Sequence, residues 1–302
     1  MKKVKAWISA ARLRTLPLAA SCILTASAVA KASGLFRADI FWLALATTLG
    51  FQVLSNFAND YGDGVKGTDM KGRVGPSRAL QSGLLSAGQL RLGMIITAGI
   101  TLLLASLLIF MAFGNDNFLL SFIFFNLAIA AVIAAVTYTV GKGAYGYRAM
   151  GDLFVFLFFG LVGVMGCYYL YAQTFGSGVV LMAVTIGALC VAVLNLNNMR
   201  DRMSDKGAGK RTLAVILGER KVRIYHLALL VLAFLSAFVY LWVYTDPPLG
   251  FLPLVAFLPL LLNAIKVMRV SDLSSLDPEL KKVALSTFLF ALLLFAGQWI
   301  KG

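Results

Sequence analysis

A first cluster of oxygen-bearing side chains lies between residues 59 and 69. Asn59 and Asp63 stand four residues apart, so a helix would present both on one face, and Asp60 and Asp69 add two carboxylates. Carboxylates this close together repel one another unless a cation neutralises them. The cluster therefore predicts a bound cation.

A second cluster lies between residues 197 and 205. Asn197, Asp201 and Asp205 recur every four residues and would share one face of a helix. Oxygen ligands without His or Cys nearby indicate a hard ion, and Mg²⁺ usually takes one or two carboxylates and completes its shell with water and phosphate oxygens. Two clusters together predict two Mg²⁺ ions that hold a diphosphate.

Basic side chains are interleaved with both clusters, at Lys66, Arg78, Arg200, Lys210 and Arg211. Charge-assisted hydrogen bonds from these residues would hold the same polyanion. The alternative is that the carboxylates only cap helices and balance nearby Lys and Arg. Two similar clusters, both opening at helix ends on the same predicted side, favour the binding site.

The segments that must position these clusters are long and apolar. Hydrophobic residues make up 60% of the 302 residues and charged residues 13%, whereas about 25% of the residues of a soluble domain are charged. Nine runs approach the roughly 20 residues that a helix needs to cross a bilayer, without the alternation of a β-barrel. We predict an all-α, polytopic membrane protein with nine transmembrane helices in a single domain over residues 1–302. The predicted spans are Leu16–Ala32, Phe41–Ala58, Leu92–Phe113, Phe118–Thr139, Leu153–Ala172, Val179–Leu196, Tyr225–Tyr244, Leu249–Val267 and Val283–Ile300.

Positive charge predicts the orientation of the spans. All of the 27 Lys and Arg residues except Lys31, Arg37 and Lys301 fall on one side. Cytoplasmic loops retain positive charge, so we expect the N-terminus and both clusters to be cytoplasmic and the C-terminus outside, in a multi-pass protein of the inner (plasma) membrane. Loop retention and the lipid bilayer explain the net charge of +14. No nucleic acid partner is predicted, because none of the loops is long enough to form a groove-reading module.

The cysteines and the single histidine show no catalytic spacing. Cys22, Cys167 and Cys190 all fall inside predicted spans, and we interpret them as packing residues. His226 falls just inside the seventh span, where an interfacial or packing role is favoured over acid–base chemistry.

Several further motifs follow one another in a fixed order along the chain. They are Asn59-Asp60-Tyr61-Gly62-Asp63, Gly75-Pro76-Ser77-Arg78 continuing through Gln81 to Gly83, Tyr138 to Lys142, Tyr145-Gly146-Tyr147 leading to Gly151-Asp152, and Asn197 to Asp205 continuing to Lys210. With these motifs, nearly the whole chain resembles the UbiA superfamily of intramembrane prenyltransferases. The resemblance implies a nine-helix bundle around a chamber that opens near the cytoplasmic face and sideways to lipid.

The resemblance also implies roles for individual residues. Asn59 and Asp63 match the family's Asn-x-x-x-Asp-x-x-x-Asp motif, but Gly67 stands where its last Asp would be, and Asp69 follows two residues later. The expected catalytic residues are Asp63, Asp201, Lys142 and Tyr138. The expected diphosphate-binding residues are Asn59, Lys66, Arg78, Gln81, Asn198, Arg200 and Lys210. The expected metal ligands are Asn59, Asp60, Asp63, Asp69, Asp201 and Asp205.

Within the superfamily, the sequence resembles the branch that prenylates 1,4-dihydroxy-2-naphthoate in menaquinone biosynthesis. The resemblance implies Mg²⁺-dependent transfer of a polyprenyl chain from polyprenyl diphosphate to that acceptor, with loss of CO₂ and diphosphate, to give demethylmenaquinone. One alternative is another aromatic acceptor, such as 4-hydroxybenzoate. The other is a membrane transporter, against which the charged residues gather at one face and most spans have apolar centres.

Overall fold

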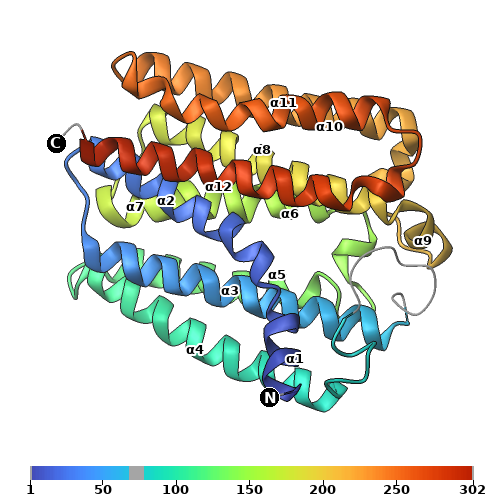
Figure 1. Cartoon of the computed structure of the whole chain (residues 1–302). Coiled ribbons are helices and arrows are strands. Elements are labelled where there is room, and N and C mark those ends of the chain that lie inside the picture. The colour runs from blue at the N-terminus through green and yellow to red at the C-terminus, as the bar shows by residue number, and fades with distance from the viewer. Residues whose placement is uncertain (1, 68–77, 301–302) are drawn as a thin grey trace.

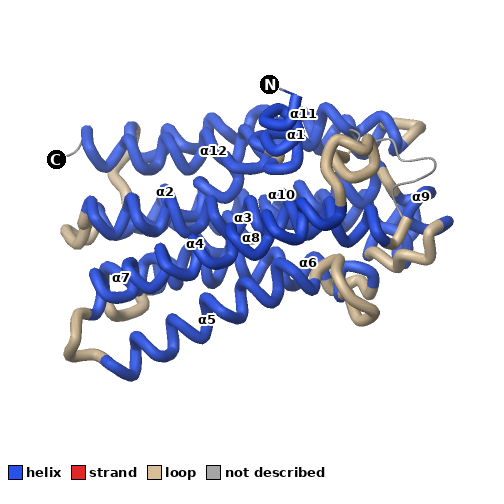
Figure 2. Tube along the Cα trace, turned by 90° about the horizontal axis from the view of Figure 1, so that it is seen from below, coloured by secondary structure: helices blue, strands red, loops and turns tan. Residues whose placement is uncertain are grey.

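The computed structural model describes residues 2–67 and 78–300, and within these ranges all regular secondary structure is helical (Figure 2). Nine helical segments of the described chain are long and apolar enough to cross a membrane, which confirms the predicted fold class. The α-helices are α1 (Lys2–Ala11), α2 (Leu16–Ala32), α3 (Ala38–Val65), α4 (Ala87–Phe113), α5 (Phe118–Thr137), α6 (Gly151–Val155), α7 (Cys167–Ala172), α8 (Ser177–Arg200), α9 (Arg202–Gly207), α10 (Leu213–Tyr244), α11 (Phe257–Arg269) and α12 (Asp277–Ile300). Shorter or non-α segments are η1 (Leu13–Thr15), η2 (Tyr145–Tyr147), the π-helix η3 (Phe156–Gly166), η4 (Leu249–Ala256) and η5 (Leu273–Leu276).

The long helices run side by side, and the short helix α1 runs across their direction next to α3 (Figure 1). Their outward faces carry large apolar side chains, among them Trp42, Leu103 and Phe118, each more than 60% exposed. A surface of this kind is unfavourable in water and is suited to contact with lipid tails. The bundle is therefore built to be covered by a bilayer.

Helix α8 is the most enclosed of the spans. Within its most apolar stretch 72% is buried, compared with 11% for the same kind of stretch in α5. Small residues let η3 pack closely against α8. A Cβ atom on Gly187 would lie 2.8 Å from the Phe156 ring, and one on Gly160 would lie 2.7 Å from the Ala183 carbonyl oxygen. Close approach through glycine is typical of helix pairs in membranes, because it allows dense backbone packing without a hydrophobic driving force.

Two helices extend farther towards the charged end of the bundle than the predicted spans. Helix α3 continues past Ala58 to Val65, and α10 begins at Leu213 rather than Tyr225, with a non-helical break at Gly218 (φ 73°). Hydropathy marks the part of a helix that lies in lipid, whereas a helix can continue into the polar interface on hydrogen bonds alone. As a result, Asn59, Asp60 and Asp63 lie within the last turns of α3 and not in a loop.

A buried chain of polar side chains joins α10, α11 and α12. His226 Nε2 lies 2.8 Å from Asn263 Oδ1, Asn263 Nδ2 donates to Glu279 Oε2 at 2.9 Å, and Lys282 Nζ lies 2.8 Å from Glu279 Oε1. His226, Asn263 and Glu279 are almost completely buried. This supports the packing role predicted for His226, which does not line the substrate-sized cavity described below.

Replacing Asn263 with Leu is expected to destabilise the protein by about 1–3 kcal/mol, because His226 and Glu279 would each lose a buried hydrogen bond. The measurement is thermal unfolding of the purified protein in detergent. Asn126→Leu is the matched control, since Asn126 is exposed on α5 and donates to the Phe122 carbonyl of its own helix. Equal melting temperatures for the two variants would contradict a stabilising role for the buried chain.

Candidate active site

A cavity of about 500 Å³ lies inside the bundle and has one polar end. Asn59, Asp63, Arg78, Asn197 and Lys210 line the polar end, and Arg12, Arg14, Asp277 and Lys281 add further charged groups to the lining. The remaining lining is largely apolar and comes from α2, α3, α4, α5, α6, η3, α7, α8 and α12. This shape is suited to a ligand with a charged head and an apolar body.

Asp63 is buried at the polar end of the cavity, where it contacts Arg78 and Tyr147. Arg78 Nη1 lies 2.7 Å from Asp63 Oδ2, and the Tyr147 hydroxyl donates to Asp63 Oδ1 at 2.7 Å. Helix α3 reaches this point because Gly62 packs directly on the turn after α5, where a Cβ atom would lie 2.8 Å from the Thr139 carbonyl carbon. The glycine therefore lets α3 bring Asp63 next to Tyr138.

Asp60, one turn earlier than Asp63, has a different environment. Its Oδ2 accepts the Ala79 amide at 3.0 Å and its Oδ1 accepts the Leu80 amide at 3.2 Å. Both oxygens thus hold the segment that carries Arg78, whose guanidinium also donates to the Asn59 carbonyl. These contacts favour a positioning role for Asp60, whereas Asn59 and Asp63 face the cavity.

Tyr147 connects the two clusters. Its hydroxyl binds Asp63, and its ring lies 4.2 Å from Lys66 Nζ and 5.4 Å from Lys210 Nζ, both within the range of cation–π attraction. Lys210 Nζ also lies 3.7 Å from Asp205 Oδ1. The two sequence clusters therefore lie in one region, with Lys210 between them.

The second cluster is organised around a fully buried arginine. Arg200 Nε and Nη2 donate to the two oxygens of Asp201 at 2.9 and 2.6 Å, and Nη2 also donates to Asn197 Oδ1 at 2.8 Å. Its remaining Nη1 binds Asp277 at the start of α12. Arg200 therefore fixes the end of α8 against α12, and of these residues Asn197 and Asp277 line the cavity.

Tyr138 lines the cavity beside Asp63. Burial, followed by the negative charges of Asp152, Asp63 and Asp205, raises the pKa of Tyr138 well above its usual range. Its hydroxyl therefore stays protonated at neutral pH and is available as a hydrogen-bond donor.

The structure does not bring every predicted site residue to the cavity. Lys142 and Gln81 are exposed, and neither lines the cavity in the described part of the chain. Asn198 is buried and does not line the cavity in the described part of the chain, whereas its neighbour Asn197 does. Asp69 lies outside the described residues. Asp201 and Asp205 are buried and do not line the cavity in the described part of the chain.

Some residues of the site region were not predicted as site residues. Tyr147, which does not line the cavity but contacts Asp63, lies within the quoted Tyr145-Gly146-Tyr147 motif, and that motif is the sequence signal that could have found it. Arg12, Arg14, Asp277 and Lys281 belong to cation-rich segments that hydropathy alone assigns to loops. The three cysteines, predicted to be packing residues, are buried free thiols in the cavity wall.

The donor set at the polar end fits a hard cation. The oxygens that could serve as ligands belong to Asn59 and Asp63 in the cavity lining and to the buried Asp201 and Asp205 outside it. Those of Asp63 and Asp201 now accept hydrogen bonds from Arg78, Tyr147 and Arg200, which a bound cation would have to replace. Within the described residues, no three His, Cys, Asp or Glu side chains are grouped tightly enough to hold a metal. An ion here would need water or ligand oxygens to complete its shell, which is the usual condition of Mg²⁺.

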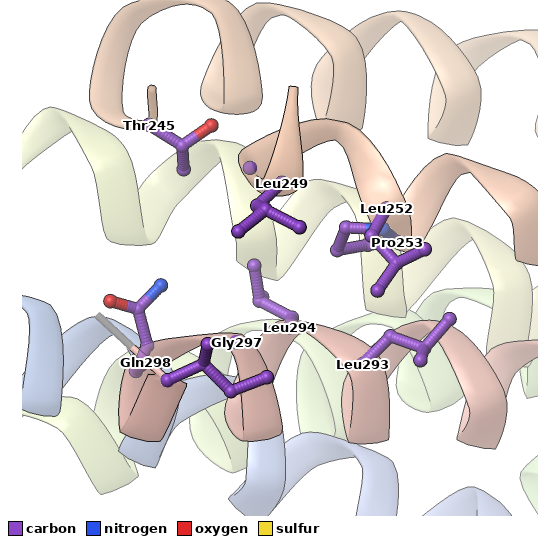
Figure 3. Close-up of a pocket in the computed structure, with 10 residues that line it drawn as sticks. Thr245, Leu249, Leu252, Pro253, Leu293, Leu294, Gly297 and Gln298 are labelled. Carbon is purple, nitrogen blue, oxygen red and sulfur yellow. The ribbon is translucent and has the colours of Figure 1, made fainter. Parts of the chain in front are cut away.

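A second, much smaller pocket lies between the start of η4 and the end of α12 (Figure 3). Its lining is mainly apolar, with Leu249, Leu252 and Pro253 facing Leu293, Leu294 and Gly297 of α12 and with Gln298 at one edge. Its volume of about 30 Å³ suffices for about one water molecule. The large cavity is therefore the candidate active site.

The helical bundle and the cavity together define a multi-pass membrane protein. Its chamber is largely apolar, and carboxylate, arginine and lysine side chains line one end. The UbiA prenyltransferase family model matches residues 19–297, so the chain belongs to that family. The chain is 42% identical to the 1,4-dihydroxy-2-naphthoate octaprenyltransferase of Haemophilus influenzae, over 99% of this chain and 97% of that protein. It is 38% identical to the enzyme of the same name from Escherichia coli, over 99% and 98% of the two chains.

Solved structures of the family share the fold. A UbiA homolog from Aeropyrum pernix K1 superposes with a TM-score of 0.67 at 15% identity, covering 94% of this chain and 97% of that one. A homolog from Archaeoglobus fulgidus bound to DMAPP and Mg²⁺ gives a TM-score of 0.61 at 17% identity, over 98% and 99% of the chains. The nine-helix architecture predicted from the sequence is thus the architecture of this family.

Proposed function

We propose that this protein transfers a polyprenyl chain from polyprenyl diphosphate to 1,4-dihydroxy-2-naphthoate in menaquinone biosynthesis. Family membership supports prenyl transfer, and the relatives from Haemophilus influenzae and Escherichia coli, which align over almost their full lengths, support this acceptor. The observation that carries the proposal is the cavity itself, because an apolar chamber that ends at Asp63, Arg78 and Lys210 suits a prenyl tail and its diphosphate head.

The reaction breaks the allylic carbon–oxygen bond, and the electron pair leaves with diphosphate. Arg78 and Lys210 provide positive charge where negative charge develops on the leaving group, and Tyr138 provides a hydrogen-bond donor. The apolar walls exclude water, which would otherwise trap the allylic cation. The ring carbon that bears the carboxylate then forms the new bond, and the departure of CO₂ returns an electron pair to the ring.

Asn59 and Asp63, which line the cavity, would hold one Mg²⁺ ion, and the buried Asp201 and Asp205 would hold a second. When bound, the metal neutralises diphosphate charge and assists its departure. The Archaeoglobus fulgidus homologs bound to Mg²⁺ with DMAPP or with GPP support this cofactor. The site would face the cytoplasm from the inner membrane, since nearly all Lys and Arg residues lie on its side of the bundle.

The assay uses membranes containing the protein, geranylgeranyl diphosphate and Mg²⁺, with each candidate acceptor supplied separately. Turnover with 1,4-dihydroxy-2-naphthoate and release of CO₂ are expected. Turnover with 4-hydroxybenzoate alone would contradict the acceptor assignment. Passage of substrate into proteoliposomes without any prenylated product would indicate a transporter.

Tyr147→Phe is expected to reduce the turnover rate by about tenfold, since it removes one hydrogen bond to a buried carboxylate and keeps the ring beside both lysines. Tyr169→Phe is the matched control, because Tyr169 belongs to an aromatic cluster with Phe113 and Phe124 and does not line the cavity. A rate equal to that of the control would show that the Tyr147 hydroxyl does not act on Asp63.

A further inference from the structure

Thr139 is a buried polar residue next to the site, and the proposed transfer has not yet given it a role. It lies in the turn after α5, between Tyr138, which lines the cavity, and Lys142, which does not line it in the described part of the chain. The Thr139 side chain is fully buried and is itself outside the cavity lining. Its hydroxyl therefore acts on protein atoms and not directly on a ligand.

The Thr139 hydroxyl lies against the end of α3. Its Oγ1 lies 2.9 Å from the Ala58 carbonyl oxygen and 3.3 Å from Asn59 Oδ1, so a single proton is shared between two acceptors. Three-centre hydrogen bonds of this kind are common at helix ends. Of the two acceptor residues, Asn59 lines the cavity. The hydroxyl thus connects the turn after α5 to a candidate metal ligand.

The position of the Thr139 hydroxyl is fixed by its surroundings. The Tyr138 carbonyl, which precedes Thr139, accepts the Gly146 amide at 3.0 Å. Gly62 of α3 allows the close approach, because a Cβ atom there would lie 2.6 Å from Thr139 Oγ1. A β-branched side chain also has few accessible rotamers. The hydroxyl is therefore held in place before any ligand binds.

A fixed donor of this kind controls which atom of Asn59 faces the cavity. An amide oxygen has two lone pairs, so Asn59 Oδ1 can accept from Thr139 and still bind a cation. Without this partner, the terminal amide rotates broadly about its last bond and could present its NH₂ group instead. That group would be repelled by Mg²⁺, and the ion would lose a ligand. Residues that orient a metal ligand by a hydrogen bond typically raise metal affinity by about 10- to 100-fold.

We propose that Thr139 is a positioning residue, which orients Asn59 so that its amide oxygen faces Mg²⁺ in the cavity. This inference rests on the proposed function, in which Mg²⁺ holds the diphosphate at the polar end. Tyr147 has the corresponding role for Asp63, because its hydroxyl donates to Asp63 Oδ1. The connection between α5 and α6 thus orients both cavity-facing candidate ligands of α3.

The test measures the Mg²⁺ concentration at which binding of radiolabelled geranyl diphosphate to the full-length protein in detergent is half-maximal. Thr139→Val nearly keeps the shape of the side chain and removes the hydroxyl, and it is expected to raise that concentration by about tenfold or more. Thr139→Ser keeps the hydroxyl and should restore a value within about twofold of the wild type.

Thr137→Val is the matched control. Thr137 stands two residues earlier, is exposed, and donates to the Ile133 carbonyl of its own helix. The same substitution at this position should leave the half-maximal Mg²⁺ concentration unchanged. Equal values for Thr139→Val and Thr137→Val would mean that the Thr139 hydroxyl does not orient a metal ligand.

A second background separates an action through Asn59 from a general effect on the fold. Asn59→Asp keeps the size of the side chain and places an oxygen at both of its end positions, so the ion finds a ligand in either orientation. In this background, Thr139→Val should change the half-maximal Mg²⁺ concentration by less than about twofold. A loss of equal size in both backgrounds would overturn the positioning role.

The result is distinguishable from failure of the proposed function, because binding is measured without turnover. If the variants behave as expected but the wild-type protein does not convert 1,4-dihydroxy-2-naphthoate, the proposed acceptor is wrong and the positioning role stands. If geranyl diphosphate binds the wild-type protein equally well without Mg²⁺, the positioning role is wrong whatever the acceptor.

Discussion

Asp63→Asn is expected to lower turnover by at least about 100-fold, and Asp201→Asn to do the same, while both proteins remain folded in the membrane. Asp63 faces the cavity, where its charge would neutralise a cation and where it also holds Arg78 and Tyr147. Asn keeps the size of the side chain and one oxygen but removes the negative charge. The measurement is prenyl transfer from geranylgeranyl diphosphate in purified membranes, with thermal unfolding measured in parallel.

Two further aspartate variants make the result interpretable. Asp116→Asn is the matched control, because Asp116 is exposed in the short connection between α4 and α5, and its activity should equal that of the wild type. Asp60→Asn should mainly reduce stability and the order of the segment carrying Arg78, since Asp60 accepts two backbone amides. Full activity in both Asp63→Asn and Asp201→Asn would show that the two carboxylates have only a structural role, through their contacts with Arg78, Tyr147 and Arg200.

Removal of Mg²⁺ is expected to abolish both turnover and binding of the diphosphate substrate. In the described part of the chain, no three metal-binding side chains come together. The protein alone should therefore bind Mg²⁺ weakly, and the ion should bind tightly only when diphosphate oxygens complete its shell. Titration of geranyl diphosphate with and without Mg²⁺ tests this, and by linkage the diphosphate must raise Mg²⁺ affinity by the same factor.

Titration of Mg²⁺ into the substrate-free protein can contradict this prediction. Tight Mg²⁺ binding by the substrate-free protein would mean that a preformed metal site exists, contrary to the donor arrangement in the cavity. Diphosphate binding of equal strength after chelation would mean that Arg78 and Lys210 suffice without a metal. In Asp63→Asn, the coupling between the ion and the diphosphate should be largely lost, whereas in Asp116→Asn it should be retained.

The sequence determined the class of protein because hydropathy and helix length depend on neighbouring residues along the chain. Nine apolar runs were sufficient to predict nine membrane helices, and the i, i+4 spacing of Asn59 and Asp63 was sufficient to place both on one helix face. The same local information could not find the helix ends, because a helix such as α3 continues beyond the lipid on backbone hydrogen bonds that hydropathy does not register.

Only the tertiary structure decided which of these polar residues face the cavity. Asp60 and Asp63 are three residues apart and similar in sequence context, yet one accepts backbone amides and the other lines the cavity. Tyr147 joins the two clusters, and Arg12 enters the cavity, because helices distant in the chain pack together. A side chain's role depends on partners brought by other helices, so local spacing predicts the face it occupies but not what that face meets.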